Sequence, residues 1–391
     1  MQLESFFDPN LVKGISFSEN PLPYFEQLVA DYPSGYLSVP CFGAGTANTE
    51  FEVQTGMNMD DFGPGEYPYK TILQKTACES MAFDMKNLGY KAHAVHNNEA
   101  TFYDRHKVFA QLGFDTFTPI EYMYDIERNP TGWCKDKVLV GEIEKVLDSS
   151  IGSDFVYTIS VQGHGKYPSF EYYCEQIHEM DEFVGQLINM LNTRMEPTVL
   201  VLYGDHLPGF EWTAQEMENE SLFQTKYVVW NNVNLPAVKR NVEAYQLAAH
   251  VLNMLDIHEG TMLRFHQRHL DAWDTDTQSY LDAMKLLQYD ILYGDHEVYG
   301  GESPYQATQL EFGVTPIIQG TTVHNTDQVI VFGGPFNSWS KICVNGKAAD
   351  TQYYSKTRLI AKGVEPKEKE EITVQQVGRD KIHLGTARKK Q

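Results

Sequence analysis

Positive charge is scarce in this chain of 391 residues, and its scarcity excludes one class of partner. Lys and Arg number 31 against 53 Asp and Glu, which gives a formal net charge of −22. A nucleic-acid binder needs a basic face to meet the phosphate backbone, so the sequence argues against that function. A phosphate group bound by so acidic a protein needs local positive charge from a metal ion, an Arg or a His.

Cysteines and long apolar runs are scarce as well. The five cysteines are scattered, with no Cys-x-x-Cys pair, so neither a zinc site nor a redox framework is indicated. No apolar stretch is long enough to span a bilayer, and the first residues do not resemble a signal peptide. Hydrophobic residues still make up 42% of the chain, which is enough for a sizeable core. The length suits two domains, or one large domain with an appendage.

Apolar strands alternate with helical patterns between residues 36 and 255, which predicts an α/β fold with a doubly wound, mostly parallel sheet. Its central stretch runs from Thr198 to Tyr203 and is rich in Val and Leu, as in a strand buried on both faces. Asp205 and His206 follow Gly204 directly. Ligands of open α/β sheets bind at the carboxyl ends of the strands, so this pair is well placed to hold a metal. A pair of this kind can instead only cap a helix or make a turn.

Two glycine-bearing turns after other strands carry further candidates. One places Thr46 ahead of a helix expected from about Asn48, where backbone N–H groups suit a phosphate or an activated oxygen. The alternative is that Thr46 is only an N-cap. The other turn holds His164 between two glycines after the strand at 154–161. The flanking glycines have no side chains that could pack against the imidazole ring, so His164 is not expected to be a packed core histidine.

A polar loop follows the strand that ends at His96, and it carries Tyr103 and Arg105. Arg offers a fork of donors to phosphate oxygens, so this loop is a candidate substrate wall. The alternative is a surface Arg that pairs with a nearby acid, which is the commoner fate of a single Arg.

The candidate ligands at separate strand ends are Glu4, Thr46, Asp205 and His206. Two carboxylates, one imidazole and one alkoxide suit Mn²⁺, Mg²⁺ or Zn²⁺. A metal on the Thr oxygen would lower its pKa and make it a nucleophile. Arg105 and His164 would then hold the anionic oxygens of the centre under attack.

The pattern changes at about residue 315, where short strands follow one another at close spacing without a helical stretch. Asn345 and Gly346 carry the signal of a two-residue hairpin. This part is expected to be a small all-β, immunoglobulin-like sandwich that folds independently. The predicted division is therefore a catalytic domain at 1–300, a linker at 301–314 and the sandwich at 315–391.

Several motifs in order resemble the lipoteichoic acid synthase and phosphoglycerol transferase group, in the sulfatase-like branch of the alkaline phosphatase superfamily. The stretches that carry the resemblance are Leu3–Phe6, Gly45–Phe51, His96–Arg105, the loop with His164, Tyr203–His206 and Gln288–Gly294. The tail resembles an IPT/TIG module through Ser340–Gly346 and Tyr354–Leu359. Each stretch is a weak signal alone, but their order along the chain is specific.

The resemblance implies a role for each candidate. Those expected to hold one divalent cation, with Mn²⁺ first and Mg²⁺ or Zn²⁺ as alternatives, are Glu4, Thr46, Asp205 and His206. Thr46 would also be the nucleophile. Those expected to line the phosphoglycerol pocket are His96, Tyr103, Arg105 and His164. The family often has Trp where Tyr103 stands and an acid where Asn98 stands, and these two departures bear on which head group is bound.

The function implied is transfer of glycerophosphate from a phosphatidylglycerol-like membrane lipid to a glycan or polyglycerophosphate acceptor, on the extracellular face of the cell membrane. Phosphoethanolamine transfer is the alternative that also uses a Thr nucleophile. Sulfatase-like hydrolysis would need a Cys or Ser followed by Pro and Arg, and the segment after Cys41 lacks both. An inactive cell-surface module that binds glycans through the tail is the alternative of another class.

Only Met1-Gln2-Leu3 precedes Glu4, where the family's sheet begins with an apolar strand. The family's transmembrane helices have no counterpart in this sequence either. We expect an upstream segment with an apolar strand, a linker and transmembrane helices, which would supply the membrane association. A ligand at position 4 on a frayed terminus would be poorly held.

Overall fold

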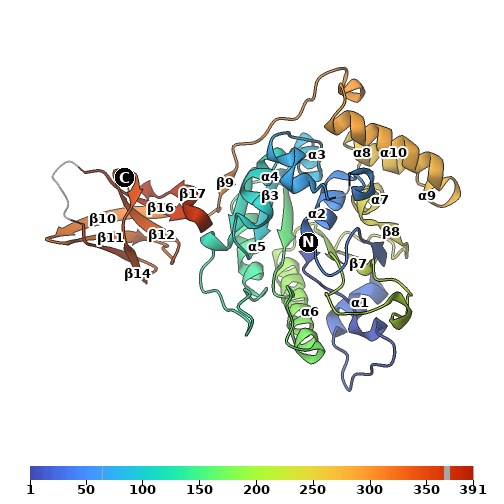
Figure 1. Ribbon diagram of the computed structural model, residues 1–391, viewed down its shortest axis with the longest axis horizontal. Helices are drawn as coiled ribbons and strands as arrows, with labels where there is room; N and C mark the ends of the chain where they lie inside the picture. Colours follow the sequence, from blue (N-terminus) through green and yellow to red (C-terminus); the bar gives the residue numbers. More distant parts are fainter. Residues whose placement is uncertain (64, 365–369, 391) are drawn as a thin grey trace.

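The computed structural model describes residues 1–63, 65–364 and 370–390. A large α/β part comes first in the chain, and a smaller part built of strands extends from its side (Figure 1). This order of an α/β domain followed by an all-β part is the one expected from the sequence.

The α/β part is organised around a nine-stranded sheet. In spatial order its strands are β8 (Val242–Glu243), β2 (Ser34–Ser38), β7 (Gln224–Asn231), β6 (Val199–Gly204), β1 (Gln2–Leu3), β5 (Asp154–Ile159), β3 (Lys91–His96), β4 (Thr116–Pro119) and β9 (Glu311–Phe312). Only β2 with β7 and β7 with β6 pair antiparallel. The mostly parallel sheet is therefore confirmed.

Both faces of this sheet are covered, because successive side chains of a strand point to opposite faces. In β7, Tyr227 and Val229 belong to one buried cluster, and Val228 and Trp230 belong to another. The helices that pack on the first cluster are α2 (Thr46–Thr55), α3 (Met81–Asn87), α4 (Arg105–Gln111) and α7 (Ala244–Met254). Those on the second are α1 (Pro23–Asp31), α5 (Val138–Asp148) and α6 (Phe170–Arg194).

Three further helices follow α7: α8 (Thr261–Arg268), α9 (Ala272–Thr275) and α10 (Thr277–Leu292). They lie at the end of the α/β part that is remote from the strand-rich part (Figure 1). Among the described residues, no helix combines the length and apolar character needed to cross a membrane.

Strand β1 is only two residues long, yet it lies between β5 and β6 in the middle of the sheet. The amino group of Met1 is buried and donates to the Val201 carbonyl at 2.6 Å, and this burial lowers its pKa to about 5. Residues 1–4 are thus held on both sides, which differs from the frayed terminus expected from the sequence. The reason is the hydrogen-bonding of β1 to its two neighbours.

The strand-rich part consists of two sheets. One has the order β14 (Thr351–Ser355), β15 (Arg358–Lys362), β11 (Gln328–Gly334), β10 (Ile318–Asn325) and β18 (Arg388–Lys389). The other has the order β13 (Lys347–Ala348), β12 (Ser340–Val344), β16 (Ile372–Val377) and β17 (His383–Thr386). Asn345 and Gly346 both have positive φ between β12 and β13, as the predicted hairpin requires.

The segment at 301–314, which was expected to be a linker, is in part bound to the α/β part. Its strand β9 pairs with β4 at the edge of the large sheet. Further contacts join the two parts at the short helix η6 (Ile120–Tyr122), where the Asn337 side chain donates to the Glu121 carbonyl at 2.8 Å and to the Met123 carbonyl at 3.2 Å. Independent folding of the tail stays a prediction, but the tail is docked.

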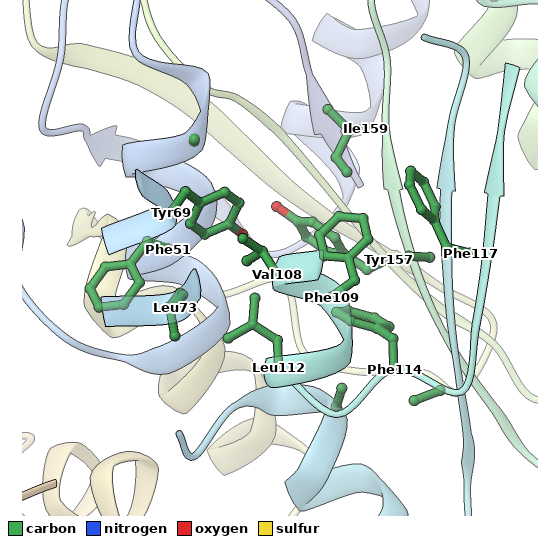
Figure 2. Close-up of a cluster of buried hydrophobic side chains, with 14 of the residues drawn as sticks. Phe51, Tyr69, Leu73, Val108, Phe109, Leu112, Phe114, Phe117, Tyr157 and Ile159 are labelled. Carbon is green, nitrogen blue, oxygen red and sulfur yellow. The ribbon is translucent and has the colours of Figure 1, made fainter. Parts of the chain in front are cut away.

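Aromatic side chains fill the space between α4 and the sheet (Figure 2). The ring of Phe109 lies 5.1 Å from that of Phe114 and 4.9 Å from that of Phe117, in tilted and edge-on arrangements. All three residues are fully buried. Close packing of this kind makes the cluster sensitive to the loss of a single ring.

We expect Phe109→Ala to lower the free energy of unfolding by about 3–5 kcal/mol, because it removes apolar contacts and leaves a cavity. Phe223→Ala is the control, since Phe223 is 51% exposed; its cost should be about 1 kcal/mol or less. Urea unfolding followed by circular dichroism measures both. Similar losses for the two variants would contradict the packing described here.

Candidate active site

The ends of two neighbouring strands bring three potential ligands together. Glu4 follows β1, and Asp205 and His206 follow β6, the adjacent strand. One ligand atom from each lies within 4.8 Å of the others. Thr46 reaches the same place as the first residue of α2. All four side chains are buried, with at most 2% of each residue exposed.

The Thr46 hydroxyl points into this cluster. It donates to Glu4 Oε2 at 3.0 Å and lies 3.5 Å from His206 Nε2. His206 Nε2 lies 3.6 Å from Glu4 Oε1 and 3.5 Å from Asp205 Oδ2. The other ring nitrogen, Nδ1, is 2.8 Å from the Leu207 carbonyl, and a proton on Nδ1 leaves Nε2 as the ligand atom.

Negative charge is concentrated here. Burial, together with the Glu4 carboxylate, raises the pKa of Asp205 to about 7, although His206 opposes the shift. Burial acts to lower the pKa of His206, but the charges of Asp205 and Glu4 outweigh this effect, and the pKa is raised. Two buried carboxylates side by side therefore need a positive partner.

The donor set fits a divalent cation. Asp205 Oδ1 accepts a hydrogen bond from the Ser5 backbone at 2.7 Å, whereas the buried Oδ2 has no hydrogen-bond partner among the described residues. A buried carboxylate oxygen without a partner is costly unless a ligand satisfies it. Oxygen and imidazole donors around one point match the preferences of Mn²⁺, Mg²⁺ or Zn²⁺.

Two glycines allow the chain beyond β1 to pass between the strand ends. A Cβ at Gly204 would lie 2.0 Å from the Phe6 carbonyl oxygen, and one at Gly163 would lie 2.1 Å from the Glu4 carbonyl oxygen. Any other residue would clash with the backbone there. These glycines thus set how closely Glu4 approaches Asp205 and the loop that holds His164.

Arg105 lies behind the cluster in a fully buried ion pair. Its Nη2 and Nε donate to Glu50 Oε2 at 2.8 and 3.1 Å, and neither side chain is exposed. Its Nη1 lies 3.2 Å from His96 Nε2, while His96 Nδ1 lies 2.9 Å from the Ile159 carbonyl. Burial and the Arg105 charge hold the pKa of His96 well below its ordinary value, so the ring is neutral. The structure thus commits the donors of Arg105 and both nitrogens of His96 to protein groups.

The loop between β3 and α4 brings Tyr103 to the cluster. Tyr103 and Asp104 both have positive φ, at 55° and 57°. Non-glycine residues in this region are strained, and such strain gathers at functional sites. Burial and the nearby Glu4 carboxylate raise the pKa of Tyr103. The Arg105 guanidinium lies 5.2 Å from the Tyr103 ring centroid, which fixes the ring over the buried ion pair.

His164 is packed, although its flanking glycines have no side chains. Its ring stacks on Trp133 with a centroid distance of 4.4 Å and an interplanar angle of 13°, and the edge of Phe102 lies 5.8 Å away. His164 Nδ1 lies 2.9 Å from the Gly165 carbonyl. The ring is therefore held by residues distant in sequence, and His164 remains partly exposed.

Sequence reasoning missed Glu50 and Trp133. Glu50 lies four residues after Thr46, about one turn further along a helix that is buried on nearly every side. An acidic residue in such a helix signals a positively charged partner, because a buried acid is rare unless it is paired. Nothing local marks Trp133, because it lies in the loop between β4 and α5, whereas its partner His164 follows β5. Helix α2 begins at Thr46, two residues earlier than expected, so the hydroxyl points out from the helix start.

We expect Glu50→Gln to lower the free energy of unfolding by about 3–5 kcal/mol, since it leaves the Arg105 charge buried without a counter-charge. Glu127→Gln is the matched control, because Glu127 and Lys137 form an ion pair with side chains 59% and 49% exposed. Its loss should cost about 1 kcal/mol or less. Thermal unfolding of both variants gives the comparison, and equal stability would rule out a structural role for the buried pair.

The sulfatase family model matches residues 2–257. A protein of Rhizobium meliloti (strain 1021) named for cyclic β-1,2-glucan modification is 26% identical over 275 residues, which cover 61% of this chain and 42% of the relative. The capsular polysaccharide biosynthesis protein RkpI of the same organism is 28% identical over 225 residues, which cover 53% and 40%. The chain thus spans about two fifths of the length of these curated relatives.

Solved structures share the fold at low identity. The phosphoglycerol transferase GacH of Streptococcus pyogenes, in complex with sn-glycerol-1-phosphate, has a TM-score of 0.67 at 20% identity and covers 78% of this chain and 88% of its own. The lipoteichoic acid synthase LtaP of Listeria monocytogenes has a TM-score of 0.56 at 20% identity, with coverages of 67% and 72%. An alkaline phosphatase superfamily protein of Vibrio parahaemolyticus has a TM-score of 0.54 at 11% identity, with coverages of 98% and 79%.

The family model covers well over half of the chain, and these folds agree with it. The chain belongs to the sulfatase family.

Proposed function

We propose that this protein is a metal-dependent phosphoglycerol transferase that uses Thr46 as its nucleophile. The observation that carries the proposal is the convergence of the Thr46 hydroxyl with Glu4, Asp205 and His206 in one buried cluster. The donor would be a phosphatidylglycerol-like lipid and the acceptor a glycan or polyglycerophosphate. The reaction would take place on the extracellular face of the cell membrane.

In the first half of the reaction, Thr46 Oγ attacks the phosphorus atom of the lipid's phosphodiester. The P–O bond to diacylglycerol breaks, the Thr46 proton leaves to solvent, and the diacylglycerol oxygen takes up a proton. Glu4, Asp205, His206 and Thr46 would hold a divalent cation, which when bound would lower the pKa of the Thr46 hydroxyl and offset the charge on the phosphoryl oxygens. Thr46 also stands at the start of α2, whose helix dipole favours an anionic group there.

In the second half, an acceptor hydroxyl attacks the phosphorus atom and the bond to Thr46 Oγ breaks, so that Thr46 regains its proton. Tyr103 and His164, both partly exposed beside the buried cluster, would contact the glycerophosphate directly. Arg105 and His96 would act behind them by fixing the position of this wall. This refines the roles expected from the sequence, where all four residues line the pocket.

The names of the relatives favour a glycan acceptor. One is named for modification of a cyclic β-1,2-glucan and the other for synthesis of a capsular polysaccharide. A sulfatase-like reaction at Cys41 is disfavoured, because the thiol lies 3.3 Å from the Gly45 carbonyl and burial raises its pKa.

We expect Thr46→Ala to lower the release of diacylglycerol from a fluorescent phosphatidylglycerol by about 10⁴-fold or more, as loss of a nucleophile does. The melting temperature should stay close to that of the unchanged protein. Thr193→Ala is the control, since Thr193 is exposed on α6. Thr49→Ala would not be a suitable control, because the Thr49 hydroxyl donates to the Asp205 carbonyl at 2.7 Å. Undiminished lipid cleavage by the Thr46 variant would end this mechanism.

We expect the purified protein to hold one divalent cation per chain, with Mn²⁺ the leading candidate, and Asp205→Asn to weaken its affinity more than about a hundredfold, because a direct ligand is lost. Asp154→Asn is the matched control, since Asp154 is buried at the opposite end of the strands and pairs with His93. Elemental analysis and calorimetric titration with Mn²⁺ measure occupancy and affinity. Full affinity in the Asp205 variant would contradict the assigned ligands.

A further inference from the structure

The strand-rich part contributes a side chain close to the candidate active site. Trp339, just before β12, packs against a small buried cluster made of Ile120, Cys134 and Val161. Trp133 packs against the same cluster from the α/β part. Both indole rings are only partly buried. Two tryptophans from opposite sides of the domain junction therefore pack on one buried cluster, and each keeps part of its surface exposed.

This region continues into the donor side of the site. Trp133 stacks on His164, and His164 in turn meets the edge of Phe102, the residue before Tyr103. Val161 precedes the same loop and accepts a hydrogen bond from the His164 backbone at 3.0 Å. A row of aromatic rings thus leads from the proposed glycerophosphate position, through His164, to the domain junction.

Trp339 is held firmly. Its backbone N–H donates to Asn337 Oδ1 at 3.0 Å, and the Asn337 side chain is anchored on the Glu121 and Met123 carbonyls. Gln376, which is 1% exposed, donates to Asn337 Oδ1 at 2.8 Å. On the other side, the Trp133 backbone N–H donates to Asn129 Oδ1 at 2.9 Å. Rigid aromatic side chains bind with little loss of conformational entropy.

We propose that Trp133 and Trp339 form the binding site for the acceptor, and that the acceptor is a neutral glycan. The proposal rests on the transferase function above and deepens it by naming the acceptor class. The C–H groups of a sugar ring carry slight positive charge and pack on the negative face of an aromatic ring. Sites of this kind favour domain interfaces. A sugar held there would present a hydroxyl toward the side of the site that His164 borders.

The charges at the junction favour a neutral acceptor over polyglycerophosphate. Lys137 next to this segment is paired with Glu127 at 2.7 Å, and Lys135 with Glu179 at 2.9 Å. Arg379 from the strand-rich part is paired with Glu99. The net charge of −22 would repel a polyanion, and each of these three cations is already paired with a carboxylate, while Arg128 donates to the Gly132 carbonyl at 2.7 Å.

The test measures binding of cyclic β-1,2-glucan to the full chain by calorimetry, with polyglycerophosphate as the second ligand. We expect Trp133→Ala and Trp339→Ala each to weaken glucan binding about tenfold, and Trp339→Phe to retain most of it. Tyr354→Ala is the control, since Tyr354 is an exposed aromatic residue on the outer edge of the same sandwich, 58% exposed. It should leave glucan binding and lipid cleavage unchanged.

Transfer assays separate this proposal from the function on which it rests. In the Trp339→Ala protein, transfer of glycerophosphate to the glucan should fall about tenfold relative to hydrolysis of the lipid. Glucan binding with no lipid cleavage would refute the transferase function alone. Lipid cleavage with no glucan binding, tighter binding of polyglycerophosphate, or loss of glucan binding in the Tyr354 variant would each overturn the acceptor site. A Trp339→Phe protein that folds normally but binds no better than the Ala variant would also count against it.

Discussion

Repulsion between two buried carboxylates is the constraint on which the site depends. Glu4 and Asp205 come from adjacent strands whose parallel pairing places their carboxyl ends side by side. Burial and the nearby Glu4 carboxylate raise the pKa of Asp205, although His206 opposes the shift. A divalent cation would resolve that conflict, and it would tie β1, β6 and the start of α2 to one point. Both the stability of this region and the reactivity of Thr46 would then depend on the bound cation.

A second layer of charge supports the first. The ion pair of Arg105 and Glu50 is fully buried, and His96 extends it toward the sheet. A buried ion pair is costly to desolvate, but removing either partner strongly destabilises the fold because it leaves an unpaired buried charge. Its role in a transferase would be to hold Tyr103 and the strained loop around it in one position. Side chains that bind the substrate would thus be few and partly exposed, with their supports behind them.

The strand-rich tail is docked on the α/β part through hydrogen bonds to backbone carbonyls at residues 121 and 123 and through β9. An appendage that merely tethers the enzyme would not need a buried Asn337 or Gln376 at this junction. Trp339 lies on the same surface. The docked tail would then, in the proposed transferase, belong to the wall of the acceptor side.

Local signals in the sequence were enough for the architecture and for placing Asp205 and His206 directly after a central strand. The apolar run before Asp205 and His206, the strand–helix alternation and the Asn345-Gly346 hairpin each depend on neighbours in the chain, and each lies where it was expected. Only the tertiary structure decided the partners of Arg105, His96 and His164, because those partners come from other elements. Glu50 is 55 residues from Arg105, and Trp133 lies in the loop between β4 and α5, whereas His164 follows β5. An Arg donates to whichever acceptor long-range packing brings to it. The sequence around Arg105 therefore predicted a residue that contacts the substrate, whereas in the fold Arg105 supports the residues of the substrate wall from behind.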